Sequence, residues 1–157
     1  MDNHQFYIQK AVELAKEGVS KRKGGPFGAV IVKDNQIVGK GYNQVTSKND
    51  PTAHAEIVAI RNACKNLNNF QLSGCIVYAS CEPCPMCLGA IYWARPEKLI
   101  FACTKEDAKI AGFDDQFIYE EIDLPYPDRK ITTTQVGREI ALEVFSLWQD
   151  KKDKIGY

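Results

Sequence analysis

The alternation of apolar and polar residues predicts helices and strands that take turns through the middle of the chain. Apolar positions at helical spacing predict helices over 4–18, about 53–66, 84–94, 105–112, 114–121 and 138–152. Short apolar runs predict strands over 27–32, 36–41, 75–80, 98–104 and 131–136, and Asp34-Asn35 is the expected turn between the first two. This order indicates an α/β protein, a three-layer α/β/α sandwich around a mixed five-stranded sheet.

Composition and charge narrow the class of protein. The 157 residues, 45% of them hydrophobic, suit a single globular domain over 1–157. Twenty basic and twenty acidic residues cancel, so nucleic acid is not a favoured partner. The polar start "MDNHQFYIQKAVELAKEG" is not a signal peptide, and no apolar run reaches the roughly 18 residues of a membrane span. We expect a cytoplasmic protein without a membrane partner, whose six cysteines are metal ligands or buried thiols.

Histidine is scarce, which makes His54 the centre of any histidine-dependent chemistry. The only other histidine, His4, lies near a terminus that is expected to fray. Glu56 follows His54 by two residues at the start of a predicted helix, with Thr52 as the expected N-cap.

The string "SCEPCPMC" supplies a Cys-x-x-Cys pair. Cys84 and Cys87 should share one face of the first turn of a helix that starts at Pro83, where the helix dipole lowers thiol pKa values. With His54 they form one nitrogen and two sulfur ligands, and three protein ligands with an open fourth position are typical of catalytic zinc. Water at that position ionises near neutral pH, and Glu56 is placed to carry its proton.

Two alternative roles for the cysteines compete with a catalytic zinc site. Cys81, Cys84 and Cys87 match part of an iron–sulfur spacing. A cluster would need a fourth thiolate from Cys64, Cys75 or Cys103. It would also leave His54 and Glu56 without a role, and a non-catalytic zinc module would have no use for Glu56. Cys81 is expected to end a strand beside the site as a packing residue.

The motif His-x-Glu followed by Pro-Cys-x-x-Cys is the signature of zinc deaminases. Through it and the strings "GGPFGAVIVK", "NDPTAHAEIVAIRNAC" and "SCEPCPMCLGAIYWARP", nearly the whole chain resembles the cytidine/deoxycytidylate deaminase superfamily. The string "AGFDDQFIYEEI" is similar to its guanine deaminase branch. The resemblance implies zinc-dependent hydrolysis of the purine base guanine to xanthine and ammonia, with one zinc per subunit. A tRNA adenosine deaminase and a cytosine- or triazine-type aminohydrolase remain alternatives, since they share the zinc core.

The resemblance also assigns roles around the zinc ligands. Glu56 is the proton shuttle, and Asp115 bonds the N–H edge of the base and assists proton transfer. The implied substrate contacts are Phe27 by stacking, Asn43 through its side chain, Ala55 through its backbone, Trp93 as a pocket wall and Tyr157 as a lid. Simpler roles stay open: core packing for Phe27 and Trp93, and turn or helix capping for Asn43 and one of the two aspartates.

The C-terminal segment is expected to act between subunits. In the family that the chain resembles, this segment often covers an active site, commonly that of a neighbouring subunit. The resemblance therefore implies a homodimer, and it allows exchange of residues 138–157 between subunits. Tyr157 would otherwise belong to a disordered tail.

Overall fold

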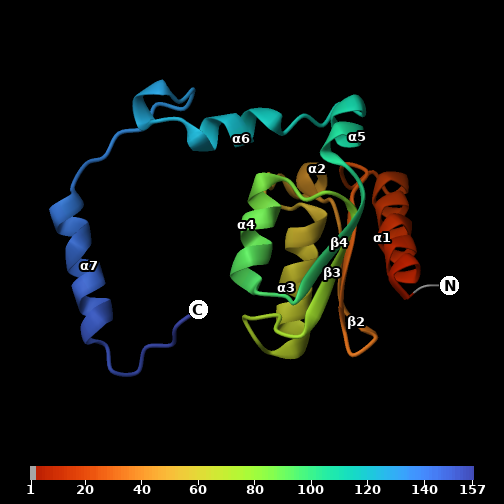
Figure 1. The fold of residues 1–157 in the computed structure, drawn as a ribbon, viewed down its shortest axis with the longest axis horizontal. Helices are drawn as coiled ribbons and strands as arrows, with labels where there is room; N and C mark the ends of the chain where they lie inside the picture. Colours follow the sequence, from red (N-terminus) through yellow and green to blue (C-terminus); the bar gives the residue numbers. More distant parts are fainter. Residues whose placement is uncertain (1–2) are drawn as a thin grey trace. The chain divides into compact units, whose positions relative to one another are not determined.

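The computed structural model describes residues 3–157 and divides the chain into two compact units, one ending at Asp115 and one spanning Gln116–Tyr157. The first unit contains a mixed sheet in the order β2-β1-β3-β4, in which β1 is antiparallel to both neighbours and β3 runs parallel to β4 (Figure 1). Its strands are β1 Gly28–Lys33, β2 Gln36–Tyr42, β3 Cys75–Cys81 and β4 Lys98–Cys103.

Helices cover both faces of this sheet (Figure 1). Helix α1 Asn3–Ser20 lies on one face, and α3 Ala55–Leu67 and α4 Pro85–Ala94 lie on the other. Two short helices, α2 Val45–Lys48 and α5 Lys105–Ile110, follow β2 and β4 in the chain. Successive residues of β1 point to opposite faces, so Ala29 and Ile31 pack with α3 and α4, whereas Val30 and Val32 pack with α1. The predicted three-layer α/β/α arrangement is confirmed.

The number of strands was predicted wrongly. The described residues form a four-stranded sheet, and residues 131–136 belong to no strand. Their β-branched side chains favour extended backbone, but a strand also needs a partner for its hydrogen bonds, and these residues pair with no strand within 3–157.

Two local features bear on the sequence predictions. Asp34 and Asn35 have φ of 49° and 62°, so the predicted turn of the β1–β2 hairpin is confirmed. His4, expected in a frayed terminus, instead lies in α1, and its Nδ1 is 2.9 Å from the hydroxyl of the buried Tyr78. This contact holds the start of α1 against the sheet, and His4 is not among the grouped candidate ligands.

Close approach of α3 to β2 depends on a glycine. A Cβ at Gly41 would lie 2.2 Å from the carbonyl oxygen of Ala55, which is the first residue of α3. No other residue fits there without moving the helix. Gly41 therefore sets the position of the helix start that carries His54.

The second unit contains α6 Gln116–Asp123, a short 3-10 turn Tyr126–Asp128 and α7 Arg138–Asp150. The Arg129 side chain donates to the carbonyl oxygens of Ile122 and Leu124, which closes the chain back on the end of α6. Apolar residues of α7 are exposed within this chain, namely Ile140, Leu142, Val144, Phe145, Leu147 and Trp148. Nowhere from Asn3 to Tyr157 is there a helix long and apolar enough to cross a membrane.

Candidate active site

Two helix starts bring the predicted ligands together. The side-chain ligand atoms of His54, Cys84 and Cys87 all lie within 4.8 Å of one another, and no other group of three or more candidate ligands occurs among the described residues. His54 is the N-cap residue of α3, and Cys84 is the N-cap residue of α4. Cys87, two residues after Pro85 at the first helical position, is fully buried.

Both helices begin slightly later than predicted. Pro85, not Pro83, opens α4, because proline fits the first helical position, where its missing N–H has no partner to lose. Thr52 does not cap α3. Its N–H and hydroxyl both donate to the Asp50 carboxylate, at 2.8 and 2.7 Å, so the chain continues as a turn until His54.

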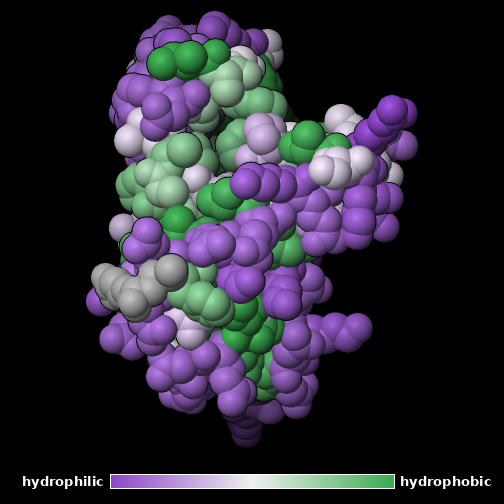
Figure 2. Space-filling model, turned by 90° about the vertical axis from the view of Figure 1, so that its right-hand side faces the viewer, coloured by the Kyte–Doolittle hydropathy of each residue, from purple (hydrophilic) through white to green (hydrophobic). Residues whose placement is uncertain are grey.

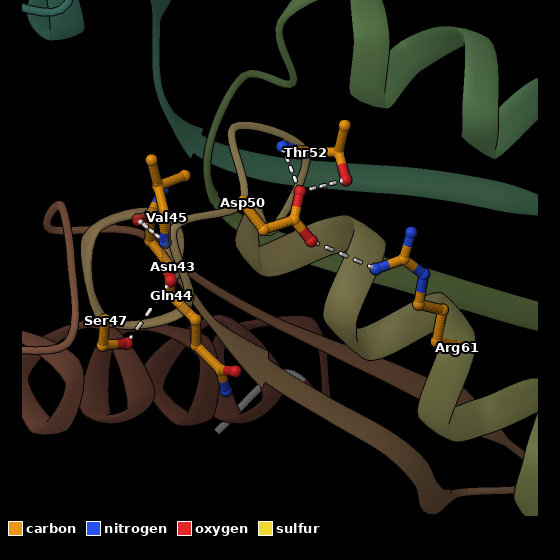
Figure 3. A network of polar contacts seen from close by, with 7 residues as sticks. All are labelled: Asn43, Gln44, Val45, Ser47, Asp50, Thr52 and Arg61. Atoms are coloured by element: carbon orange, nitrogen blue, oxygen red, sulfur yellow. Dashed lines mark hydrogen bonds and ion pairs between the residues drawn. The ribbon is translucent and has the colours of Figure 1, made fainter.

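A polar network holds this turn in place (Figure 3). Besides its bonds to Thr52, Asp50 lies 3.9 Å from Arg61 of α3, and the bonds to Thr52 lower the pKa of Asp50. The carbonyl of Ala53 accepts from the N–H of Gln44, which ties the turn to the end of β2. Hydrogen bonds at Thr52 and at Ala53 thus hold the backbone that leads into His54.

The thiols have opposite proton affinities. Hydrogen bonds from Cys87 and from His54, whose Nδ1 is 3.5 Å from the Cys84 sulfur, lower the pKa of Cys84 to about 4. The same two bonds raise the pKa values of the groups that donate to Cys84. The bond with Cys84 raises the pKa of His54, and the bond with Cys84 together with burial raises the pKa of Cys87. The lowered pKa favours the thiolate form of Cys84, and a soft cation that displaces the remaining protons gains two sulfurs and one nitrogen.

This donor set suits zinc. One imidazole and two thiolates make three protein ligands, the number typical of catalytic rather than structural zinc sites. His54, Cys84 and Cys87 would hold the ion, and the activation of water at neutral pH is the chemistry that zinc supplies there.

Glu56 lies beside the ligands without being one of them. It is 6% exposed, and its carboxylate accepts from the Cys87 thiol at 3.5 Å. Burial raises its pKa above the usual range of a glutamate. A carboxyl group with a raised pKa next to an activated water can take up and return a proton, as general acid–base catalysis requires.

A cavity of about 410 Å³ opens in front of these residues. Six of the residues singled out in the sequence line it: Phe27, Asn43, His54, Glu56, Cys84 and Asp115. Residues that sequence reasoning missed also line it, among them Thr46, Glu82, Lys105 and Phe113. The size and the mixture of one wall of aromatic rings with several polar groups suit a small heteroaromatic ligand.

Asn43 both joins two loops and faces the cavity. Its Oδ1 accepts from the N–H groups of Gly25 and Val45, each at 3.1 Å, and it is 6% exposed. These bonds fix the orientation of the amide. Within residues 3–157 its Nδ2 has no protein acceptor, so this group can donate into the cavity. The capping role and the substrate role are compatible.

The aromatic wall consists of two rings. Phe27 meets Phe113 edge to face, with 4.9 Å between the ring centroids and an angle of 85°. Phe113 directly follows Gly112, and Phe27 follows Gly24 and Gly25 with one proline in between. This repeated pairing of glycine and phenylalanine next to charged motifs is the sequence signal that could have identified Phe113.

The two adjacent aspartates differ in environment. Asp114 is exposed and lies 3.3 Å from Lys109, whereas Asp115 is half-buried and burial raises its pKa. The difference favours Asp115 as the residue that takes part in the chemistry, as the sequence resemblance implies.

Other residues singled out in the sequence differ in where they lie. Ala55 is buried at the first position of α3, where the backbone N–H has no partner within the helix. Trp93 is 65% exposed on α4 and is not among the residues that line the cavity of its own chain, so its role as a pocket wall stays a prediction. Tyr157 ends the second unit and is exposed. Cys81 ends β3 beside the cavity, where burial raises its pKa to about 11.

A second hollow of about 440 Å³ lies between α1 and α5. It shares Phe27, Cys81 and Ala108 with the first cavity but is lined mainly by apolar residues. Apolar surface is visible between the hydrophilic residues on this side of the protein (Figure 2). None of the metal ligands lines this hollow, so the chemistry belongs to the first cavity.

The sequence is similar to a deaminase family model and to individual deaminases. The family model for the cytidine and deoxycytidylate deaminase zinc-binding region matches residues 1–103. Guanine deaminase of Bacillus subtilis (strain 168) is 56% identical over 155 residues, 99% of each chain. The tRNA-specific adenosine deaminase of Aquifex aeolicus (strain VF5) is 36% identical over 142 residues, which cover 90% of this chain and 91% of that one.

Solved structures show the same likeness. The X-ray structure of guanine deaminase from Bacillus subtilis superimposes with a TM-score of 0.96 at 55% identity, over 98% of both chains. A guanine deaminase from Nitrosomonas europaea superimposes with a TM-score of 0.66 at 30% identity, over 69% of this chain and 63% of that one.

Proposed function

Since this chain belongs to the cytidine and deoxycytidylate deaminase family, we propose that it is a zinc-dependent guanine deaminase, which hydrolyses guanine to xanthine and ammonia. The observation that carries the choice of guanine is the wall formed by "GFDD", which puts Asp115 in the cavity of Glu56 and the metal ligands. This string lies within the 155 residues over which the chain aligns with guanine deaminase of Bacillus subtilis.

The residues of the cavity divide the reaction between them. Glu56 takes a proton from the attacking water and delivers it to N3 of the ring while the water oxygen bonds to C2. The second proton of that water reaches the exocyclic amine, the C2–N bond breaks, and ammonia leaves. Atoms balance, because guanine and one water give xanthine and ammonia. Asp115 accepts from the N–H edge of the base and assists the transfer to the amine.

Other residues of the cavity bind and orient the base. The ring of Phe27, braced by Phe113, offers a face for stacking on the base. The Asn43 amide donates to a carbonyl or ring nitrogen, and the N–H of Ala55 at the start of α3 donates to the base. A substrate that lacks the matching acceptor leaves Asn43 unpaired and binds more weakly.

A panel of aminated rings tests the assignment. Ammonia release should be measured with guanine, adenine, cytosine, cytidine, a triazine and tRNA, using the zinc-loaded protein. We expect release from guanine and little from the others. Turnover of tRNA instead of guanine would favour adenosine deamination, and turnover of cytosine or the triazine alone would assign the cavity to another base.

The assembly that we propose is a homodimer in which residues 138–157 of one copy cover the active site of the other, with Tyr157 as the lid. The exposed apolar residues of α7 support this proposal, because an apolar helix surface of this kind requires a partner. The two free thiolates that the metal needs also favour the cytoplasm, where thiols stay reduced. Cell fractionation tests this location, and sedimentation equilibrium tests the dimer.

Removing residues 151–157, which follow α7, should lower guanine turnover about tenfold or more while leaving the dimer and the zinc content intact. The lid then no longer excludes water from the cavity. Co-expression with a full-length Glu56→Gln chain separates the two arrangements. A lid acting between subunits restores activity in the mixed dimer, because the truncated chain keeps Glu56 and receives the tail of its partner. A mixed dimer that stays inactive would show that the tail acts within its own chain, and unchanged kinetics would remove the lid altogether.

A further inference from the structure

Glu82 lines the same cavity as His54, Cys84 and Asp115. It follows the last residue of β3 and precedes Cys84 by two residues. Its N–H donates to the carbonyl of Cys103 at 2.8 Å, which continues the pairing of β3 with β4. The residue lines the cavity and is half-buried. The deamination reaction gives its carboxylate no task.

The Glu82 carboxylate bonds to the start of the next helix. It accepts from the backbone N–H of Lys105 at 3.1 Å. Lys105 is the first residue of α5, and its N–H is one of those that a helix leaves without an internal partner. The side chains of Thr104 and Asp107 form a reciprocal capping box at the same helix start. The bond from Glu82 therefore adds a link from the metal loop that the capping box does not provide.

The segment that follows α5 forms part of the cavity. Ala108 lies on α5, and Gly112, Phe113 and Asp115 follow it, all lining the cavity. Gly112 has a φ of +90°, so the chain turns sharply directly before Phe113. α5 is only six residues long and has no buried residue, so few packing contacts hold it. The position of α5 therefore depends on the hydrogen bonds at its start.

We propose that Glu82 is a positioning residue: its bond to the Lys105 N–H holds α5 against the metal loop and thereby keeps Phe113 and Asp115 in the cavity. Glu82 touches neither the metal nor the base in this role. The inference rests on the proposed function for its kinetic readout and on the fold alone for its structural readout.

Two pairs of variants break this bond from either side. Glu82→Met removes the acceptor at similar size, whereas Glu82→Gln keeps an oxygen that can accept. Lys105→Pro removes the N–H at a helix position that tolerates proline, and Lys105→Ala keeps it while removing the side chain. Thr104 has φ of −89° and ψ of 170°, a conformation that a following proline permits. Glu106→Ala, an exposed position on the same helix, is the control.

We expect Glu82→Met and Lys105→Pro to lose about tenfold in kcat/KM for guanine and to exchange the amide hydrogens of residues 105–115 faster, with unchanged zinc content. Glu82→Gln and Glu106→Ala should stay within about twofold of the parent. Lys105→Ala, whose side chain lines the cavity, serves as a comparison in hydrogen exchange only, and it should keep the slow exchange of the parent over 105–115. The double variant Glu82→Met/Lys105→Pro should be no worse than either single variant, because both remove the same bond.

Three results would overturn the proposal. The first is a Glu82→Gln variant as impaired as Glu82→Met, which would make the charge itself essential. The second is additive losses in the double variant, and the third is unchanged hydrogen exchange over 105–115 in both Glu82→Met and Lys105→Pro. A parent protein without activity on guanine would instead refute the proposed function, and the exchange measurements would still decide the role of Glu82. If Glu82→Met fails to fold, the hydrogen exchange of residues 105–115 in Lys105→Pro and Lys105→Ala decides it, because only the first of these variants lacks the N–H.

Discussion

The Glu56→Gln variant should bind one zinc per chain and lose guanine deamination by about 10²–10⁴-fold, the usual contribution of a general acid–base group. Glutamine has nearly the shape of Glu56 but cannot take a proton from water. The loss should appear in kcat, because the variant keeps the cavity and its contacts with the base. Steady-state kinetics and metal analysis on the same preparation check both halves of this expectation.

The structure supplies the reason to expect zinc retention. Glu56 is not one of the three grouped ligands, and glutamine fills nearly the same space without adding or removing a ligand. A second variant for comparison is Cys81→Ala, a buried thiol that lines the cavity but lies outside the ligand group, and it should keep both the zinc and most of the turnover. Loss of zinc in Glu56→Gln would show that the carboxylate supports the metal, and substantial residual turnover would exclude the shuttle role.

The second large effect is expected at Asp115. Asp115→Asn should lower guanine turnover by about 10²-fold or more, because an amide can neither accept a proton from the base nor pass one to the leaving amine. Burial raises the pKa of Asp115, which brings a carboxyl group closer to the range in which it can both take up and release protons. Steady-state kinetics with guanine measure the loss.

Asp114→Asn provides the comparison. The two side chains are adjacent in sequence, but Asp114 is exposed and paired with Lys109. Its loss should cost far less activity than that of Asp115. Equal effects at both positions would mean that the acidic pair acts through its overall charge, and a silent Asp115→Asn would contradict the choice of guanine, which depends on the "GFDD" string.

Patterns local to the chain predicted a group of residues that the structure brings together. His54, Cys84 and Cys87, the candidate ligands of the sequence, lie within 4.8 Å of one another, and apolar periodicity placed the helices at whose starts they lie. The errors at the helix starts are small but physical: Asp50 captures Thr52, and Pro85 suits the first helical position better than Pro83 does.

Features that depend on distant contacts were not predictable. Phe113 reaches the cavity only because α5 returns the chain toward Phe27, and Glu82 gains its partner from a helix more than twenty residues later. Residues 131–136 have the composition of a strand, yet strand formation requires a neighbour that composition cannot supply. The position of Trp93 depends on which face of α4 is covered, and the strongly apolar sequence of that helix does not mark one.

Because His54 and Cys84 are N-cap residues, their positions affect which parts of the sequence can change without disturbing the metal site. His54 and Cys84 stand just before α3 and α4, and Cys87 lies in the first turn, so every later turn of both helices is downstream of the metal. Substitutions, or even added turns, at the far ends of these helices change the scaffold without changing the distances between the ligands. Sequence drift in this protein should therefore be tolerated toward the helix C-termini and resisted within the few residues at their starts. Transfer of the three candidate ligands to another scaffold requires those two helix starts at the same separation.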